Sequence, residues 1–308
     1  MKSGLLLWCI LICIMLVFGL AEAAISAELK TVEQAYPMLS SGVLSNAKVT
    51  TLPKGVILRS GSLKITQKQL DDEVAKAPAE LRTQLKSNLF FLLENKAASD
   101  LLLAEAKAWA KKNNRTTSES DQKLLQAYFE NMTSNLSVPD EEAKGFFESN
   151  KSMMGDANYE QVKDQVKAYL LAQKRQGVVD KYINTISKRN VIEIDGAWVA
   201  KQYVLAMNNP VDKVRKSGKP SFVDFGADGC QPCEMMTPIL DSLKKEYAGK
   251  LNVLFVHVRK EQVLAARYGI QAIPVQIFFD KSGKEVFRHV GFFPKEQIIA
   301  KLAEMGVK

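Results

Sequence analysis

The chain has 308 residues, enough for roughly two domains of ordinary size. Its 42 Lys and Arg against 34 Asp and Glu give a formal net charge of +8. The basic residues are scattered and have no accompanying pattern of aromatic residues, which argues against a nucleic-acid-binding protein and favours a solvated basic surface.

Residues 1–23 have the pattern of a secretory signal peptide. Lys2 supplies the positive start, Leu5–Leu20 is apolar, and Ala21-Glu22-Ala23 fits a cleavage site. The apolar run is shorter than the roughly 20 residues that span a bilayer, although a retained membrane anchor stays open as the alternative. The sequence therefore predicts an exported protein of the periplasm or cell envelope, which is membrane-associated only if this segment is retained.

Residues 24–52 are predicted to form an N-terminal arm or linker. The many Ser and Ala residues, with Pro37 and Gly42, are typical of a loosely ordered or lightly helical segment, and no chemistry is assigned to it. A domain is then predicted over residues 53–196. It opens with a short strand and turn at residues 56–65, and the Thr66-x-x-Gln69 capping box predicts a helix from about Gln67 to near Pro78.

The rest of residues 53–196 is predicted to be mostly helical. Apolar residues recur at spacings of three and four, as in helices with one buried face. The expected helices span residues 79–113, 119–136, 139–150 and 159–189. A closing strand at Val191–Ile194 could pair with Val56–Ile65, which would tie the end of this domain to its start.

Three segments of this domain resemble a known family: the run that begins Lys64-Ile-Thr-Gln, the run Val138-Pro-Asp-Glu-Glu-Ala, and the run that begins Tyr159-Glu-Gln-Val. Over about residues 55–195 the chain is similar to the helical N-terminal chaperone region of SurA-type and related parvulin isomerases. No parvulin domain follows, so isomerase activity is not expected. The resemblance implies a surface for unfolded or extended clients, with a helical spacer or a dimerisation module as the alternatives.

Residues 197–308 alternate between helical and strand patterns. After a helical stretch at Trp198–Arg215, strands are predicted at residues 221–225, 252–258, 275–279 and 285–290. Helices are predicted from the Cys-x-x-Cys to about Tyr247 and at residues 261–268 and 294–304. This order predicts a central mixed sheet flanked by helices. The whole chain is therefore expected to be an α+β protein of two domains, a mostly all-α domain followed by an α/β domain.

The chemistry is expected at Cys230 and Cys233, where a strand runs into a helix. Cys9 and Cys13 lie in the predicted signal peptide, so cleavage leaves only this Cys-x-x-Cys pair. The unpaired N–H groups and the dipole at a helix N-terminus favour a thiolate, and a second thiol one turn along can close a disulfide. A zinc site would need two more ligands, and only His257 and His289 remain, without finger spacing. The sequence predicts no metal and no cofactor beyond the redox-active disulfide.

The C-terminal domain resembles thioredoxin over about residues 197–308. The matching residues are Val223-Asp-Phe, Ala227, Cys230-x-Pro-Cys233, Met235, Pro238-Ile-Leu, Tyr268-Gly-Ile, Ile273-Pro274 and Val290-Gly291. The resemblance implies that Cys230 attacks client disulfides and Cys233 resolves the mixed disulfide. It assigns proton transfer with Cys233 to Asp224, for which a solvent-edge position is the alternative.

The resemblance also implies a client groove and a direction of reaction. Ile273, a cis-peptide Pro274 and Gly291 are expected to bind an extended client, while Gln231, Pro232 and Pro238 support the motif. Ile273 before the proline is the residue type of reductases. The family has tryptophans where this chain has Gly226 and Gly229, and glycine in place of Gln231, which leaves partner specificity and redox potential open.

These features predict an exported thiol–disulfide oxidoreductase, in the first place a disulfide reductase of protein clients that draws electrons from a membrane thiol donor. The alternatives are a holdase chaperone in which the thioredoxin fold mainly binds, a disulfide oxidase or isomerase, and a reductase dedicated to one partner.

Overall fold

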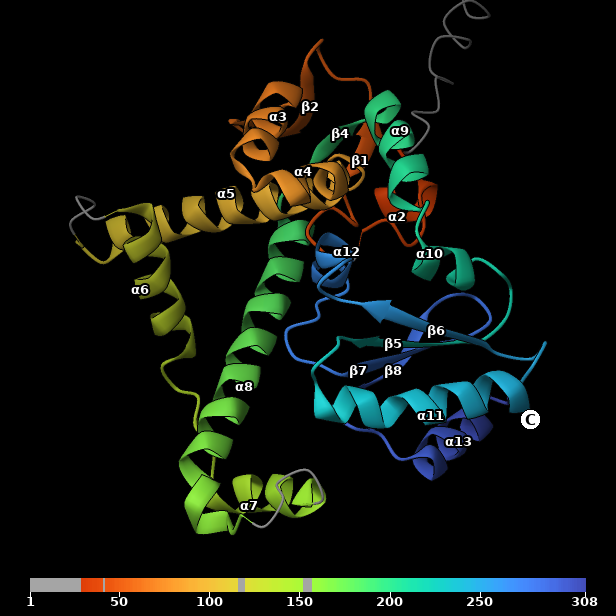
Figure 1. The fold of residues 1–308 in the computed structure, drawn as a ribbon. Helices are drawn as coiled ribbons and strands as arrows, with labels where there is room; N and C mark the ends of the chain where they lie inside the picture. Colours follow the sequence, from red (N-terminus) through yellow and green to blue (C-terminus); the bar gives the residue numbers. More distant parts are fainter. Residues whose placement is uncertain (1–28, 41, 116–119, 152–156) are drawn as a thin grey trace, which may run out of the picture. The chain divides into compact units, whose positions relative to one another are not determined.

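A computed structural model describes residues 29–40, 42–115, 120–151 and 157–308 (Figure 1). The predicted signal peptide at residues 1–23 lies outside these residues. Within the part that the structure describes, no helix is both long and apolar enough to cross a membrane.

The N-terminal part is built on a four-stranded sheet of β1 (Lys48–Thr50), β2 (Val56–Ser60), β3 (Leu63–Thr66) and β4 (Glu193–Asp195), in the order β1-β4-β2-β3. The expected pairing of residues 191–194 with residues 56–65 is confirmed, because β4 runs antiparallel to β2, with Ile194 opposite Leu58. The guanidinium of Arg59 contacts the Glu193 carboxylate across this pair at 2.7 Å. Strands more than 130 residues apart in sequence thus close one sheet.

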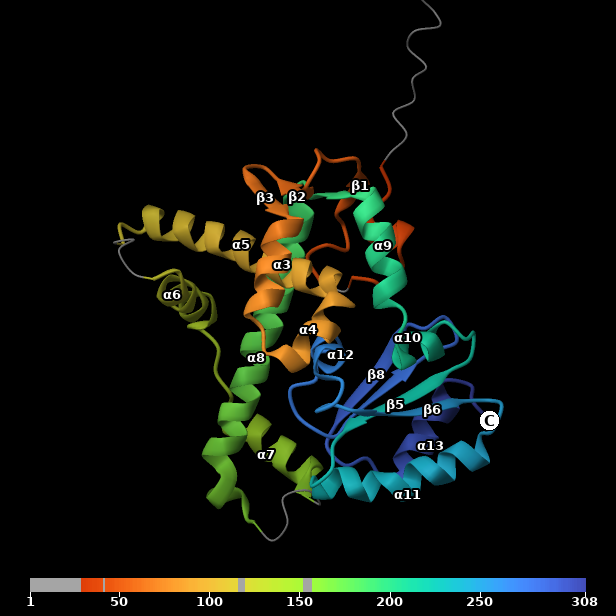
Figure 2. The same ribbon diagram turned by 45° about the horizontal axis from the view of Figure 1, so that its top comes forward.

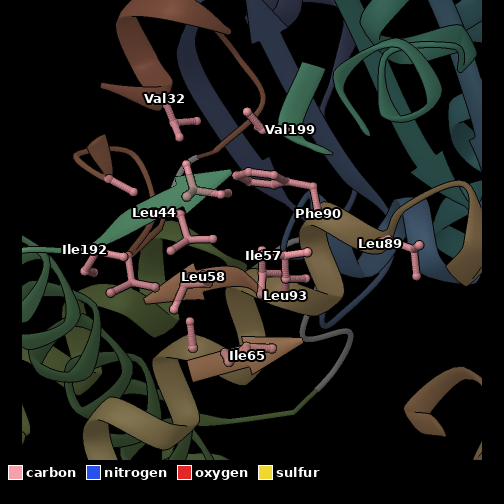
Figure 3. Close-up of a cluster of buried hydrophobic side chains, with 14 of the residues drawn as sticks. Val32, Leu44, Ile57, Leu58, Ile65, Leu89, Phe90, Leu93, Ile192 and Val199 are labelled. Atoms are coloured by element: carbon pink, nitrogen blue, oxygen red, sulfur yellow. The ribbon is translucent and has the colours of Figure 1, made fainter. Parts of the chain in front are cut away.

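Residues 31–50 differ from the expected loose arm. Thr31 and Gln34 form a capping box on the short helix α2 (Val32–Ala35), and β1 runs parallel to β4. Val32 and Leu44 are fully buried in one cluster with Leu58 and Phe90 (Figure 3). The Ser, Gly and Pro residues of this segment suggest a loop. Its apolar side chains nevertheless fill the core beside the sheet.

The helices that follow agree with the prediction at all but one point. They are α3 (Gln67–Lys76), α4 (Ala79–Lys86), α5 (Leu89–Lys112), α6 (Asp121–Thr133), α7 (Asp140–Ser149) and α8 (Tyr159–Arg189). The single helix expected at residues 79–113 is wrong, because α4 and α5 are separate. Asn88 takes the non-helical angles φ −130° and ψ 35° and donates its side-chain N–H to the Gln84 carbonyl oxygen. Asn side chains compete in this way with helical backbone bonds.

The helical stretch expected at residues 198–215 is also two helices, α9 (Gly196–Ala206) and α10 (Pro210–Arg215). Asn209 caps α10 by accepting the N–H of Asp212 at 2.9 Å, and Pro210 occupies the first turn. Val199 and Met207 pack into the N-terminal core, whereas Val211 packs into the C-terminal core. The change of core therefore falls after Met207, whereas the sequence suggests a boundary at residue 196.

The C-terminal part is a four-stranded mixed sheet in the order β6-β5-β7-β8. Its strands are β5 (Ser221–Gly226), β6 (Asn252–His257), β7 (Val275–Phe279) and β8 (Glu285–Val290), of which only β5 and β6 are parallel. Helices α11 (Gln231–Glu246) and α13 (Lys295–Glu304) cover one face, and α10 and α12 (Gln262–Arg267) the other (Figures 1 and 2). The predicted fold class, a mostly helical N-terminal part and an α/β C-terminal part, is confirmed.

Candidate active site

Cys230 and Cys233 form a disulfide at the start of α11, with their Cα atoms 5.2 Å apart. Cys230 is the N-cap residue, and its carbonyl oxygen accepts the N–H of Glu234 at 3.0 Å. Cys230 is partly exposed, whereas Cys233 is only 4% exposed. When the disulfide is reduced, Cys230 Sγ is therefore the sulfur that a client can reach. It lies at the positive end of a 16-residue helix, where a thiolate is stabilised.

The neighbouring residues lie where the sequence places them. Gln231 is exposed, and Pro232 lies in the first turn of α11, where a missing N–H leaves no hydrogen bond unmade. Pro238 lies inside α11 on its exposed side.

Asp224 is fully buried in the centre of β5, which rules out a solvent-edge position for it. Its carboxylate oxygen Oδ1 accepts a hydrogen bond from Nε2 of Gln276 at 2.8 Å. Burial raises the pKa of the Asp224 carboxyl to about 6, against the opposing effect of the Gln276 bond. A buried carboxyl with such a pKa can exchange a proton near neutral pH.

The Asp224 side chain lies on the disulfide side of the sheet. A Cβ atom on Gly226 would lie 3.4 Å from Cys233 Sγ, so Gly226 faces the disulfide. Side chains alternate along a strand, and Asp224 is two residues before Gly226 on β5, so it points to the same face. Gly226 keeps the space between strand and disulfide free of a side chain.

Three residues predicted for client binding lie at the ends of β7 and β8. The Ile273–Pro274 peptide bond is cis, as expected from the sequence. Gly291 follows β8 and donates its N–H to the Pro274 carbonyl oxygen at 2.8 Å, so these two residues are in direct contact. Ile273 is half-buried and precedes β7.

Sequence reasoning missed three side chains of this site. Gln276 is a polar residue in the apolar strand Val275–Phe279, which is the signal that could have identified it. Phe255 pairs with Asp224 from β6, and its ring carbon Cε2 would be 2.9 Å from a Cβ on Gly226. His257 Nε2 lies 3.0 Å from Asp228 Oδ2 in the loop before Cys230, and nothing in the sequence spacing indicates this contact.

Within the described ranges, no three His, Cys, Asp or Glu side chains are grouped as metal ligands. The reactive groups that the structure shows at this site are the sulfur pair and the buried carboxyl. A cysteine pair at the end of a central strand, with the outer thiol at a helix N-terminus and the inner one buried, defines the class of thiol–disulfide oxidoreductases.

Comparison with known proteins agrees with this class and identifies the family. A family model described as Thioredoxin matches residues 202–304. Thioredoxin from Alicyclobacillus acidocaldarius is 39% identical over 28% of this chain and 82% of its own length. Thioredoxin from Haemophilus influenzae is 38% identical over 28% of this chain and 78% of its own. A crystal structure of a thioredoxin from Nicotiana alata is 28% identical, covers 31% of this chain and 80% of that chain, and has a TM-score of 0.28.

The chain belongs to the thioredoxin family through its C-terminal part, and it is a thiol–disulfide oxidoreductase. The match begins at residue 202, so the helical residues before it lie outside this relationship. The resemblance of those residues to SurA-type chaperone regions is not confirmed and stays a prediction.

Proposed function

We propose that this protein is an exported disulfide reductase of protein clients and that its helical N-terminal part binds those clients. The reaction rests on one observation, the Cys230–Cys233 disulfide at the N-terminus of α11 on the face to which Asp224 points. Export rests on the signal-like residues 1–23. The electron donor would be a membrane thiol protein, because an oxidising compartment supplies no soluble reductant of its own.

The reaction begins with the reduced pair. The Cys230 thiolate attacks one sulfur of the client disulfide, forms a mixed disulfide, and releases the other client sulfur as a thiolate that takes up a proton. Cys233 gives its proton to Asp224, and its own thiolate attacks Cys230 Sγ. The internal disulfide forms, the bond to the client breaks, and the second client thiolate accepts a proton. The client gains two electrons from the sulfur pair and two protons, one that Cys233 gave to Asp224 and one from the solvent, which took up the proton of Cys230 when that thiol ionised.

The direction of reaction rests on Ile273, the residue before the cis proline. In this proposal the backbone at Pro274 and Gly291 holds the extended client beside the disulfide. The hydrogen bond of 2.8 Å between these two residues fixes the two loops relative to each other.

The measurement that tests the direction is the reduction potential of the Cys230/Cys233 pair. We expect a value near the thioredoxin end, about −270 mV, and a value near −120 mV would make the protein an oxidant instead.

The roles of the two sulfurs are tested by Cys230→Ser and Cys233→Ser in the reduction of insulin by the mature protein. Cys230→Ser removes the attacking sulfur and is expected to abolish reduction. Cys233→Ser keeps the attack but removes resolution, so a covalent Cys230–client species should accumulate. Full activity of Cys230→Ser would contradict the mechanism.

A second candidate function, a holdase chaperone, is favoured by the way the helices pack. Helices α5 and α6 bury a small cluster around Tyr128, which touches the main N-terminal core through Leu125 and Tyr182, and helices α7 and α8 bury another around Leu170. Tyr169 on α8 stays 39% exposed. Suppression of client aggregation by the full chain with Cys230→Ser and Cys233→Ser would support this function, because such a variant has no redox chemistry.

A further inference from the structure

A row of four paired side chains crosses the C-terminal sheet on the disulfide side. Phe255 on β6 is opposite Asp224 on β5, Asp224 is opposite Gln276 on β7, and Gln276 is opposite His289 on β8. Directly opposed residues point to the same face, so all four lie on the face that α11 covers. Gln276 is the one side-chain amide in this row, and it is fully buried beside Asp224.

The hydrogen bonds of the pair leave two specific atoms without partners. Gln276 Nε2 donates to Asp224 Oδ1 at 2.8 Å. Asp224 Oδ2 and Gln276 Oε1 are buried and have no hydrogen-bond partner among the residues that the structure describes. An unsatisfied buried oxygen is costly, and on a carboxyl the cost is relieved when that oxygen takes up a proton. Oδ1 already accepts a hydrogen bond, so Oδ2 is the Asp224 oxygen that is free to accept a proton.

This inference rests on the proposed function, in which Asp224 receives the proton of Cys233. We infer that Gln276 is a positioning residue for this step: its amide holds Asp224 through Oδ1 and leaves Oδ2 as the atom that takes the proton. The same bond stabilises the ionised carboxylate, since an N–H donor favours the charged form of its acceptor. Gln276 therefore keeps Asp224 ionised, and able to act as a base, down to a lower pH than burial alone would allow.

The other groups that face Asp224 are few. Phe255 and Gln276 do not titrate, and Cys233 on α11 is the intended proton donor. His289 is the remaining titratable group of the row; its ring stacks on Phe293 at 4.2 Å, and burial lowers its pKa. His289 is one strand further from Asp224 than Gln276, so a pH effect that it caused would survive the loss of Gln276.

The test replaces Gln276 by methionine, which has the same unbranched length and no donor. Without the bond, the pKa of Asp224 should rise by about one unit. From its starting value of about 6, the ionised fraction at pH 6 then falls from about one half to about one tenth, so reduction slows about fivefold. Above about pH 8.5 both proteins have an ionised Asp224 and the rates should converge.

Two readouts measure this. The first is single-turnover insulin reduction by the pre-reduced full chain from about pH 5 to about pH 9, expressed as the ratio of variant to wild type. The second is the titration of the Asp224 carboxyl by carbon-13 NMR in the disulfide form, which needs no catalysis. If Gln276→Met does not fold, Gln276→Leu serves for both measurements.

The matched control is Gln202→Met. Gln202 is 3% exposed and also has a buried Oε1 without a partner, but it lies on α9. This control should lower stability without a change in pH profile. Asp224→Asn combined with Gln276→Met should show no pH effect beyond that of Asp224→Asn alone.

Two results would overturn the inference: an unchanged Asp224 titration in Gln276→Met with a rate ratio independent of pH, or a shift of equal size in His289→Gln. An inactive wild-type protein would instead overturn the proposed function, while the NMR titration would still decide whether Gln276 controls the protonation of Asp224.

Discussion

The burial that raises the pKa of Asp224 destabilises the fold at neutral pH. Its pKa is about 6 in the folded protein against an ordinary value of 3.8. The folded state therefore favours the protonated form, so stability is greatest below the unfolded pKa and is lost as the pH rises through the folded one. A shift of this size corresponds to about 3 kcal/mol, all of which is lost above about pH 7.

Asp224→Asn is expected to recover much of that free energy. The amide does not ionise, so the free energy of unfolding should rise by up to about 3 kcal/mol near pH 8 and change little near pH 4. Urea denaturation at the two pH values measures this. Reduction of insulin should slow at the same time, because Cys233 loses its proton acceptor. An equal stability change at both pH values would show that the carboxyl is not the source.

The site residues fall into two groups according to what the sequence reveals. Cys230, Cys233, Asp224 and Pro274 could be predicted, because each has an unusual residue type at a telling place in a strand or helix. Gln276 stands out as a polar residue in an apolar strand, but the sequence does not indicate that Gln276 and Phe255 lie beside Asp224. Both side chains reach Asp224 only through the register of three neighbouring strands. Hydrophobic patterns fix which face a side chain occupies but not which residue lies opposite it.

At the scale of elements, the sequence predicted the strands and helices of residues 221–308 almost to the residue and failed mainly in residues 31–50. Strands β7 and β8 have the bounds that the sequence predicts, residues 275–279 and 285–290, on either side of a turn that contains Gly283. Residues 31–50 have no such local signal. Their place in the sheet depends on β4, more than 140 residues later, and no local pattern indicates a partner at that distance.

This segment should contribute strongly to stability. Leu44 is fully buried in the N-terminal core, so Leu44→Ala should lower the free energy of unfolding by about 2–5 kcal/mol through lost burial and the cavity left behind. Val204 on α9 is 69% exposed, and Val204→Ala is the matched control with a small expected effect. Urea or thermal denaturation measures both. Equal effects of the two substitutions would mean that residues 31–50 are the loose arm that their composition suggests.

At the scale of the whole molecule, the chain has a hydrophobic core in its N-terminal part and a core on each face of the C-terminal sheet. Val199 and Ala206 place α9 in the N-terminal core. Val211 places α10 in the core on the sheet face that α10 and α12 cover. The family match begins at residue 202, inside α9. A boundary drawn at residue 196 would thus remove α9 from the core that it completes, which is why tests of the helical part use the full chain.

Client binding by the helical part and chemistry at α11 should be separable by client size. Phe146 and Tyr169 contact each other between α7 and α8, with ring centroids 5.5 Å apart, and Tyr169 is 39% exposed. If this pair binds clients, Phe146→Ala with Tyr169→Ala should raise KM for a protein disulfide several-fold, because exposed aromatic side chains contribute strongly to protein contacts. The rate with a small aromatic disulfide should stay unchanged, since it needs only the Cys230/Cys233 pair.

The matched control is Val204→Ala with Leu205→Ala, which removes two exposed apolar side chains from α9. A KM for the protein disulfide that stays at the wild-type value in both double variants would make the helical part a spacer and leave client recognition to the thioredoxin fold.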